Sequence, residues 1–139
     1  MNRILLSALA TILATGVVAT AAENPAVPKA KDAALAWLAL TDQGSYEASW
    51  DAAASIFRAS VTKGQWAGII QAVRSPLGAT KSRRVKSATY TQSLPGVPSG
   101  DYVVIQFETE FANRPGAIET VTPMLDKDGA WHVSGYFIK

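Results

Sequence analysis

The stretch Asp101-Tyr102-Val103-Val104-Ile105-Gln106-Phe107-Glu108-Thr109-Glu110-Phe111 decides the fold class that we predict for this chain. From Val103 onward, every second residue is apolar or small, and the residues between them are mostly polar or amphipathic. A period of two is typical of a β-strand that buries one face. The later strands can be aligned with this one, and the helices before it need its apolar face.

Turn-forming segments divide the C-terminal half of the chain into short alternating stretches. These segments are residues 94–100, 113–116 and 126–129, and each is rich in Gly, Pro, Asn or Asp. Four strands are therefore expected, at roughly residues 82–93, 101–112, 117–125 and 130–138. Short turns between consecutive strands predict an antiparallel meander.

The two short turns also predict a register for the last three strands. If each is a four-residue loop, Phe107 opposes Thr122, Thr109 opposes Thr120, and Thr122 opposes Val133. One face of the sheet would then hold the large apolar residues Val103, Ile105, Phe107, Phe111, Ile118, Met124, Trp131, Val133 and Phe137. The other face would collect the carboxylates of Glu108, Glu110 and Glu119.

Helical periodicity precedes the sheet. A first helix is expected from Lys31 to a stop at Gly44, and a second from Ser45 to Val61. A third begins at Thr62, which has capping-box spacing to Gln65, and it ends before Pro76. The order predicts an α+β domain with three N-terminal helices packed on one face of a four-stranded antiparallel meander. Trp50 and Trp66 lie on apolar helical stripes, so we expect both in the core.

The N-terminus has the pattern of a secretory signal peptide. Arg3 precedes an uncharged apolar run from Ile4 to Ala22, and Ala19-Thr20-Ala21 fits a cleavage site. The predicted organisation is a signal peptide at 1–21, a linker at 22–30 and a single domain at 31–139. The protein is thus expected to be periplasmic or secreted, with the membrane involved only before cleavage. An uncleaved anchor is the alternative, since the run approaches the roughly 20 residues that span a bilayer.

Composition excludes several classes of function. The chain has no cysteine, so it holds no disulfide, thiolate metal site or cysteine nucleophile. Its net charge of +2 is too balanced to indicate a nucleic-acid partner. No glycine-rich phosphate loop and no His-x-x-His spacing is present, so no cofactor and no metal are predicted. Asp126-x-Asp128-Gly129 lacks the remaining ligands of a calcium loop and is predicted to be a hairpin turn.

Motifs run through both halves of the chain and together resemble a known family. The helical half contains Trp37-Leu38, Ser49-Trp50, Trp66, Arg74-Ser75-Pro76-Leu77-Gly78 and Arg83. The other half contains Leu94-Pro95-Gly96, Tyr102-Val103-Val104, Glu119-Thr120-Val121 and Asp128-Gly129-x-Trp131-x-Val133-Ser134-Gly135-Tyr136. They resemble a bacterial family of secreted proteins, domain of unknown function 4019, whose members have no established activity.

The order of elements has a second, purely topological likeness. Helices followed by a meander resemble the cone of the nuclear transport factor 2-like and cystatin-like folds. A likeness of topology carries over no functional residues.

Small and hydroxylated residues interrupt the expected apolar face of the sheet. They would leave room for a pocket between sheet and helices, with an apolar wall and a few polar handles. Its candidate lining residues are Trp50, Phe107, Thr109, Thr120, Thr122, Trp131 and Gly135. The alternative is ordinary packing, in which threonines suit the strands and the tryptophans fill the space.

Charged residues suggest two further hypotheses. The carboxylates and the single histidine, His132, could take part in acid–base catalysis, but an exposed lattice of surface charges fits their spacing better. Arg74 and Arg83 flank the turn at Pro76 and could clamp an anion. They could equally attach the end of the third helix to the first strand, which a cation near the last carbonyls favours.

These observations predict a non-enzymatic domain that binds a small molecule or a protein partner, with no identifiable catalytic residue. A cone-fold enzyme of the hydrolase or isomerase type is the alternative, and it should place titratable groups inside the pocket. On the expected inner face, threonines are the only polar residues, and no titratable group is predicted there. A homodimer through the outer sheet face is also predicted, because that face mixes apolar residues with charges. Its residues would be Tyr102, Val104, Val121, Leu125, Tyr136 and Ile138, with Glu108, Glu110 and Glu119. The alternative is a monomer in which residues before Lys31, or the C-terminus of the chain, cover this face.

Overall fold

The computed structural model describes residues 23–139, so the expected signal segment lies outside the described residues. The described part contains the helices α1 Ala26–Asp42, α2 Tyr46–Ala52, α3 Ser55–Ser60, α4 Lys63–Arg74 and the short 3-10 helix η1 Ser75–Leu77. The strands β1 Thr80–Thr91, β2 Tyr102–Phe111, β3 Arg114–Leu125 and β4 Trp131–Ile138 follow them. The predicted α+β class and the antiparallel four-stranded meander are therefore confirmed.

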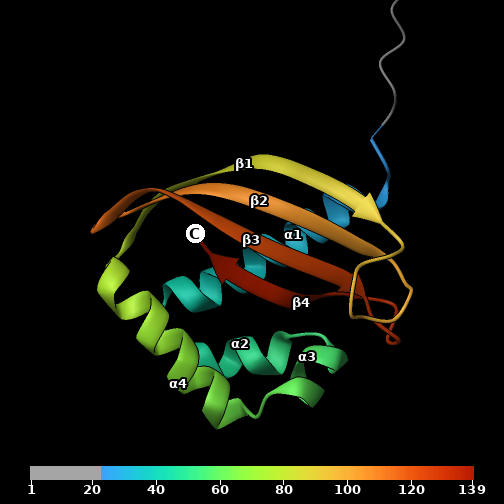
Figure 1. Ribbon diagram of the computed structural model, residues 1–139, viewed down its shortest axis with the longest axis horizontal. Coiled ribbons are helices and arrows are strands. Elements are labelled where there is room, and N and C mark those ends of the chain that lie inside the picture. Colours follow the sequence, from blue (N-terminus) through green and yellow to red (C-terminus); the bar gives the residue numbers. More distant parts are fainter. Residues whose placement is uncertain (1–22) are drawn as a thin grey trace, which may run out of the picture.

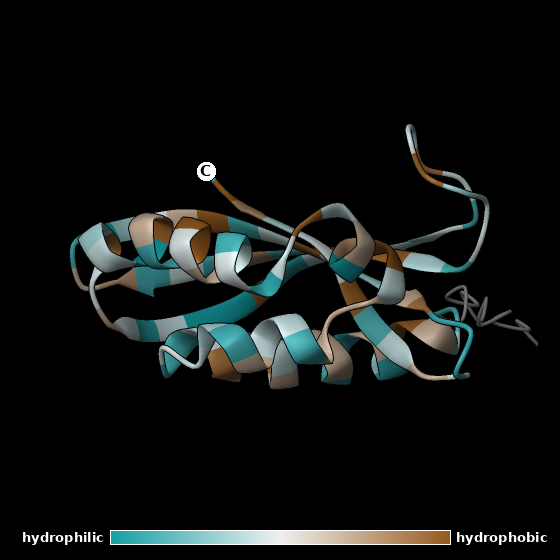
Figure 2. Ribbon diagram, turned by 90° about the horizontal axis from the view of Figure 1, so that it is seen from below, coloured by the Kyte–Doolittle hydropathy of each residue, from teal (hydrophilic) through white to brown (hydrophobic). Residues whose placement is uncertain are grey.

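The sheet and the helices form two layers. The strand order is β1-β2-β3-β4, so β1 and β4 are the edges of the sheet. Helix α1 crosses one face, called the inner face below, and contacts all four strands, while α2, α3 and α4 lie beyond β4 (Figure 1). Hydrophobic and hydrophilic bands alternate along the helices, as expected for amphipathic helices that cover a core (Figure 2).

The core lies between α1, α4 and the inner face of the sheet. It contains Val27, Ala30, Ala34, Trp37, Leu38, Trp66, Ile70, Val103, Ile105, Phe107, Val121 and Val133. The β2 residues in this set alternate with half-buried neighbours, as their sequence period predicts.

Helix α1 begins at Ala26, inside the segment expected to be a linker. The side-chain oxygen of Asn24 accepts the Ala26 N–H at 2.9 Å, which satisfies one of the free donors at the helix start. Pro28 lies in the first turn, where a missing N–H costs no helical hydrogen bond. The prolines therefore start the helix here.

The expected second helix is divided into α2 and α3. Ala53 and Ala54 are extended, with ψ of 164° and 153°. The N–H of Ala54 donates to the carbonyl of Val133 at 2.8 Å, and the carboxylate of Asp126 accepts both the N–H and the hydroxyl of Ser55 at 2.7 Å. These tertiary hydrogen bonds outweigh the helix propensity of two alanines, which is worth under about 1 kcal/mol per residue.

Helix α4 has the predicted capping box, in which Thr62 and Gln65 exchange two hydrogen bonds of 3.2 Å. Its Trp66 is buried and donates to the hydroxyl of Ser49 at 2.9 Å. The carbonyl of Ser49 in turn accepts the indole N–H of Trp37 at 2.9 Å. One buried serine thus holds the tryptophans of two helices, while Ile69 on the same apolar stripe is 52% exposed.

The predicted register between β2 and β3 is wrong. Phe107 pairs with Glu119, three positions before the expected Thr122, and Thr109 pairs with Ala117. Phe111 already pairs with Arg114, and an irregularity lies between Thr109 and Phe111. Two residues of β3 explain it: Pro115 cannot donate to the ladder, and Gly116 has a φ of +67°.

An odd shift exchanges the two faces of β3. Glu119, Val121 and Pro123 consequently lie on the inner face, and Thr120 and Thr122 on the outer one. The β3–β4 register is also wrong, since Thr122 pairs with Gly135 and Val121 with Tyr136. The residues expected to share a homodimer surface therefore do not share one face, because Glu119, Val121 and Tyr136 point toward the helices.

Replacing Trp66 tests the core between α4 and α1. We expect Trp66→Ala to lower the free energy of unfolding by about 3–5 kcal/mol, since it removes a buried aromatic ring and leaves the Ser49 hydroxyl without its donor. Ile69→Ala, on the same helix but 52% exposed, should change it by less than about 1 kcal/mol. Urea unfolding followed by circular dichroism measures both, and equal losses would contradict this packing.

Candidate functional site

A buried carboxylate occupies the middle of the inner face. Glu119 is 0% exposed and accepts a hydrogen bond from Arg83 Nε at 2.7 Å. The hydroxyl of Thr109 donates to the same carboxylate oxygen, and the phenol of Tyr136 donates to the other one. These donors come from β1, β2 and β4, so one side chain of β3 connects the whole sheet.

A second carboxylate continues this network into the helices. Asp42, the last residue of α1, accepts hydrogen bonds of 2.7 Å from both Arg74 and Arg83. Arg74 is 5% exposed, and it also donates to the hydroxyls of Thr41 at 2.9 Å and Thr80 at 3.0 Å. The candidate anion contacts Arg74 and Arg83 thus come together, and the anion they hold is Asp42. Arg74 also connects the end of α4 to β1, as the alternative hypothesis predicts.

The network shifts the pKa values of Asp42, Arg83 and Tyr136. Burial alone would raise the pKa of Asp42, but hydrogen bonds from Arg83 and Arg74 outweigh it and hold that pKa below its ordinary value. Burial alone would lower the pKa of Arg83, and the two carboxylates raise it instead. Burial and then Glu119 raise the pKa of Tyr136, which keeps its phenol a proton donor. Two arginines and two carboxylates therefore balance one another.

The inner face accordingly carries titratable groups. The prediction that threonines are the only polar residues on this face is wrong. The cause is the register of β3, which turns Glu119 inward. Every oxygen of Glu119 already accepts a hydrogen bond from the chain itself, whereas Arg74 Nε is buried without a hydrogen-bond partner among the described residues.

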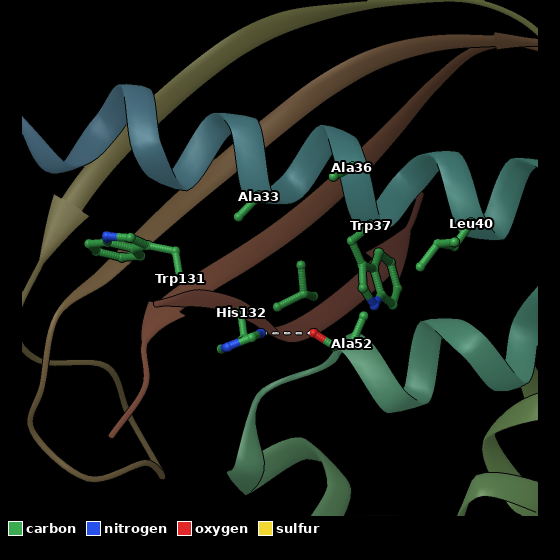
Figure 3. Close-up of a pocket in the computed structure, with 8 residues that line it drawn as sticks. Ala33, Ala36, Trp37, Leu40, Ala52, Trp131 and His132 are labelled. Atoms are coloured by element: carbon green, nitrogen blue, oxygen red, sulfur yellow. Dashed lines mark hydrogen bonds between the residues drawn. The ribbon is translucent and has the colours of Figure 1, made fainter. Parts of the chain in front are cut away.

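A recess opens beside this network, between α1, the end of α2 and β4 (Figure 3). It has a cavity volume of about 200 Å³ and is lined by Ala33, Ala36, Trp37, Leu40, Ala52, Trp131, His132 and Val133. Figure 3 shows Ala33 and Ala36 on the α1 side and Trp131 and His132 on the β4 side. The small alanines leave the space, and Trp37, Leu40 and Trp131 give it an apolar wall. We call it the α1–β4 recess.

His132 forms the polar rim of the recess. Its Nδ1 lies 3.1 Å from the carbonyl of Ala52, and its Nε2 lies 2.7 Å from the carboxylate of Asp128. Both partners are acceptors, so the doubly protonated ring satisfies both. Burial alone would lower the pKa of His132, but the hydrogen bonds with Asp128 and Ala52 raise it above its ordinary value.

The turn that carries Asp128 is itself fixed by hydrogen bonds. The N–H of Ala130 and then His132 lower the pKa of Asp128. Burial would raise the pKa of the neighbouring Asp126, but donors from Ser55 bring it down to about 2. Both carboxylates have partners within the chain, and the segment is the predicted hairpin turn between β3 and β4.

The candidate lining residues chosen from the sequence are dispersed in the structure. Trp131 lines the α1–β4 recess. Phe107 and Thr109 are fully buried on the inner face, and Thr109 donates to Glu119. Thr120, Thr122 and Gly135 are carried to the outer face.

Trp50 is half-buried, and its indole N–H donates to the carbonyl of Val61 at 2.8 Å. Lys63 Nζ lies 5.4 Å from the centre of its ring. It thus holds α2 against the segment that enters α4.

Sequence reasoning missed most of the recess. Ala33, Ala36 and Leu40 were visible only as helix formers, because alanine carries no chemical signal of a site. His132 pairs with Met124 on the edge strand, and no local pattern shows that its ring reaches the carbonyl of Ala52. Its spacing of four residues from Asp128 across a tight turn was the signal that could have placed the two together.

No group of three His, Cys, Asp or Glu residues that could hold a metal ion occurs within residues 23–139. In the same part of the chain, no helix is long and apolar enough to cross a membrane.

Comparison with known proteins adds one finding. A family model described as "Protein of unknown function (DUF4019)" matches residues 33–136. Neither the curated proteins nor the solved structures contain a significant match. The matched segment includes α1 from Ala33 onward, the recess and the ionic network, and it ends at Tyr136.

The ring of His132 tests the recess rim. Because its folded pKa is raised, we expect its stabilising contribution to be complete below pH 6.5 and to be lost as pH rises through the folded pKa. As the chain has one histidine, its ring resonances in an NMR titration are unambiguous. Asp128→Asn should bring the pKa of His132 back toward its ordinary value. A wild-type ring that titrates below 6.5 would contradict the contact with Asp128.

Proposed function

We propose that this chain, which belongs to the DUF4019 family, is a secreted or periplasmic non-enzymatic domain that binds a small apolar molecule in the α1–β4 recess. The observation that carries the proposal is the recess itself, with its wall of Trp37, Leu40 and Trp131. Concave, mostly apolar sites with few polar groups are typical of small-molecule binding.

The size of the recess limits the class of ligand. Its volume of about 200 Å³ is below the range of about 300–1,000 Å³ that drug-sized ligands fill. Apolar cavities of ~150 Å³ hold a molecule such as benzene. A compact molecule with a single or fused aromatic ring, or a short branched aliphatic one, therefore fits best.

The polar groups at the recess support binding better than catalysis. The indole N–H of Trp37 donates to Ser49, and both ring nitrogens of His132 have partners in the chain. No proton donor or acceptor among these groups is free to act on a bound molecule. The alternative of a cone-fold enzyme rests on the order of helices and strands alone, and the cystatin-like cone is itself an interpretation of that order.

The proposed location rests on the N-terminal sequence. Arg3, the uncharged run that follows and Ala19-Thr20-Ala21 form the pattern of a cleavable signal. This pattern supports export of the domain, and the binding role that we propose is therefore one outside the cytoplasm.

Filling the recess tests the proposed binding. Saturation-transfer NMR with toluene and indole should detect both probes on the wild-type protein. Ala36→Leu puts a larger side chain into the recess at little cost in helix propensity, so probe binding should be lost. Ala39→Leu, on the same helix but outside the recess, is the matched control and should bind as the wild type does. Binding that persists unchanged in Ala36→Leu, or is absent from the wild type, would overturn the proposed site.

Mass spectrometry of the protein purified from its native host tests the proposed export. We expect a mature chain that begins at Ala22, because the Ala-x-Ala pattern ends at Ala21. An intact N-terminus recovered in a membrane fraction would support the anchor alternative.

A further inference from the structure

The edge strand β4 exposes unused backbone hydrogen-bonding groups. Lys139 and Ile118 exchange two backbone hydrogen bonds, of 2.9 and 3.0 Å, so they form a hydrogen-bonded pair. By antiparallel alternation, the N–H and C=O groups of Tyr136 and Ile138 point away from β3. No backbone group within residues 23–139 pairs with them.

The chain itself already uses the other half of this edge. The extended residues Ala53 and Ala54 run beside β4, and the N–H of Ala54 donates to the carbonyl of Val133 at 2.8 Å. The carbonyl of Ala52 meets the ring of His132. Segment 52–54 thus docks on β4 near Val133, and the open part of the edge continues directly from that contact.

An apolar groove lies along the open part of the edge. It has a cavity volume of about 210 Å³ and is lined by Trp66, Ile69, Ile70, Val73, Tyr136, Phe137 and Ile138. Three of these apolar side chains are unusually exposed: Ile69 at 52%, Val73 at 43% and Phe137 at 52%. Open backbone groups and exposed apolar side chains therefore occur at the same place.

The groove is bounded by helix α4 and by the edge of β4. Helix α4 forms the wall opposite β4, so a partner must fit between a helix and a strand edge. A strand that joins β4 lies about 4.8 Å from it and needs no further width. The β4 edge of a second copy is part of a sheet with its own α4 beside it, and this bulk argues against pairing between two copies.

Charge indicates the chemistry of the partner segment. Neither α4 nor β4 contains an Asp or Glu, and the exposed Lys139 follows directly after Ile138. An apolar segment with a carboxylate near this end would pair with the side chain of Lys139 and meet no Asp or Glu of α4 or β4.

We propose that the open edge of β4 at Tyr136 and Ile138, together with the α4 groove, docks an extended peptide segment of a partner protein. The segment adds a fifth strand to the sheet, with apolar side chains at alternate positions entering the groove and a carboxylate near Lys139. Main-chain hydrogen bonds give such a contact its affinity, and the alternate side chains give it specificity. This site is separate from the α1–β4 recess, so either can fail without the other.

Selection from a display library of random linear octapeptides tests the proposal, with the mature protein as the immobilised target. Ile138→Pro removes an N–H that points away from β3 and therefore breaks no ladder hydrogen bond. Ile69→Lys places a charge in the groove at an exposed position. Leu35→Lys, at a site on α1 that is 42% exposed, is the matched control.

We expect the selected peptides to share alternating apolar residues and an acidic residue at one end. A synthetic peptide of that consensus should bind Ile69→Lys and Ile138→Pro at least about tenfold more weakly than the wild type, and Leu35→Lys equally well. N-methylation of the peptide amides that face β4 should weaken binding similarly, which tests the pairing even if Ile138→Pro does not fold.

Three results would overturn the proposal. The first is a selection that enriches no peptide over the Ile69→Lys target. The second is a consensus peptide whose binding survives both Ile69→Lys and N-methylation. The third is a wild-type dimer in sedimentation equilibrium that Ile138→Pro dissociates, since the edge would then be occupied by a second copy.

Discussion

The ion pair between Glu119 and Arg83 is the interaction on which the remaining structure depends. A carboxylate that is 0% exposed costs several kcal/mol in desolvation unless donors meet it, and here the donors come from three other strands. Arg83 also donates to Asp42 at the end of α1, and Asp42 accepts a further hydrogen bond from Arg74 at the end of α4. A slip of β3 by one residue would turn Glu119 outward and leave Arg83 and Tyr136 without it. The network therefore selects one register and one placement of the helices.

The same network decides where the molecule has room for a ligand. Sequence reasoning expected a pocket in the middle of the inner face, among threonines. In the structure, Glu119, Thr109 and Tyr136 fill that region and use one another's hydrogen-bonding capacity. On the α1 side of the sheet, space remains between α1 and β4, where the small side chains of Ala33, Ala36 and Ala52 line the recess. The proposed binding role of the α1–β4 recess rests on this division, in which the polar groups stabilise the fold and the recess keeps an apolar wall.

Local signals predicted the elements well and their pairing poorly. The capping box of α4, the strand period of β2 and the Asp126 turn are properties of neighbouring residues, and all are present. The β2–β3 register failed because Pro115 and Gly116 had been assigned to the loop. The break at Ala53 depends on Val133, about eighty residues away, and no local pattern reveals it. Arg74 and Arg83 were singled out correctly as a pair of cations, but the carboxylate between them, Asp42, belongs to a different helix.

A bulge in strand β4 lies between the two candidate sites, the α1–β4 recess and the open edge. The pairs Val133 with Pro123 and Gly135 with Thr122 leave Ser134 as the extra residue, and its hydroxyl donates to Thr122. Before the bulge, Trp131, His132 and Val133 line the recess, and the carbonyl of Val133 accepts the N–H of Ala54. After it, Tyr136 turns inward to Glu119 and stacks edge-on against Trp37, with ring centres 5.2 Å apart. The hydrogen bond from Tyr136 to Glu119 therefore fixes the open edge of β4 to the buried network. An edge fixed in this way loses little conformational freedom when a strand is added, and this preorganisation favours docking at that edge.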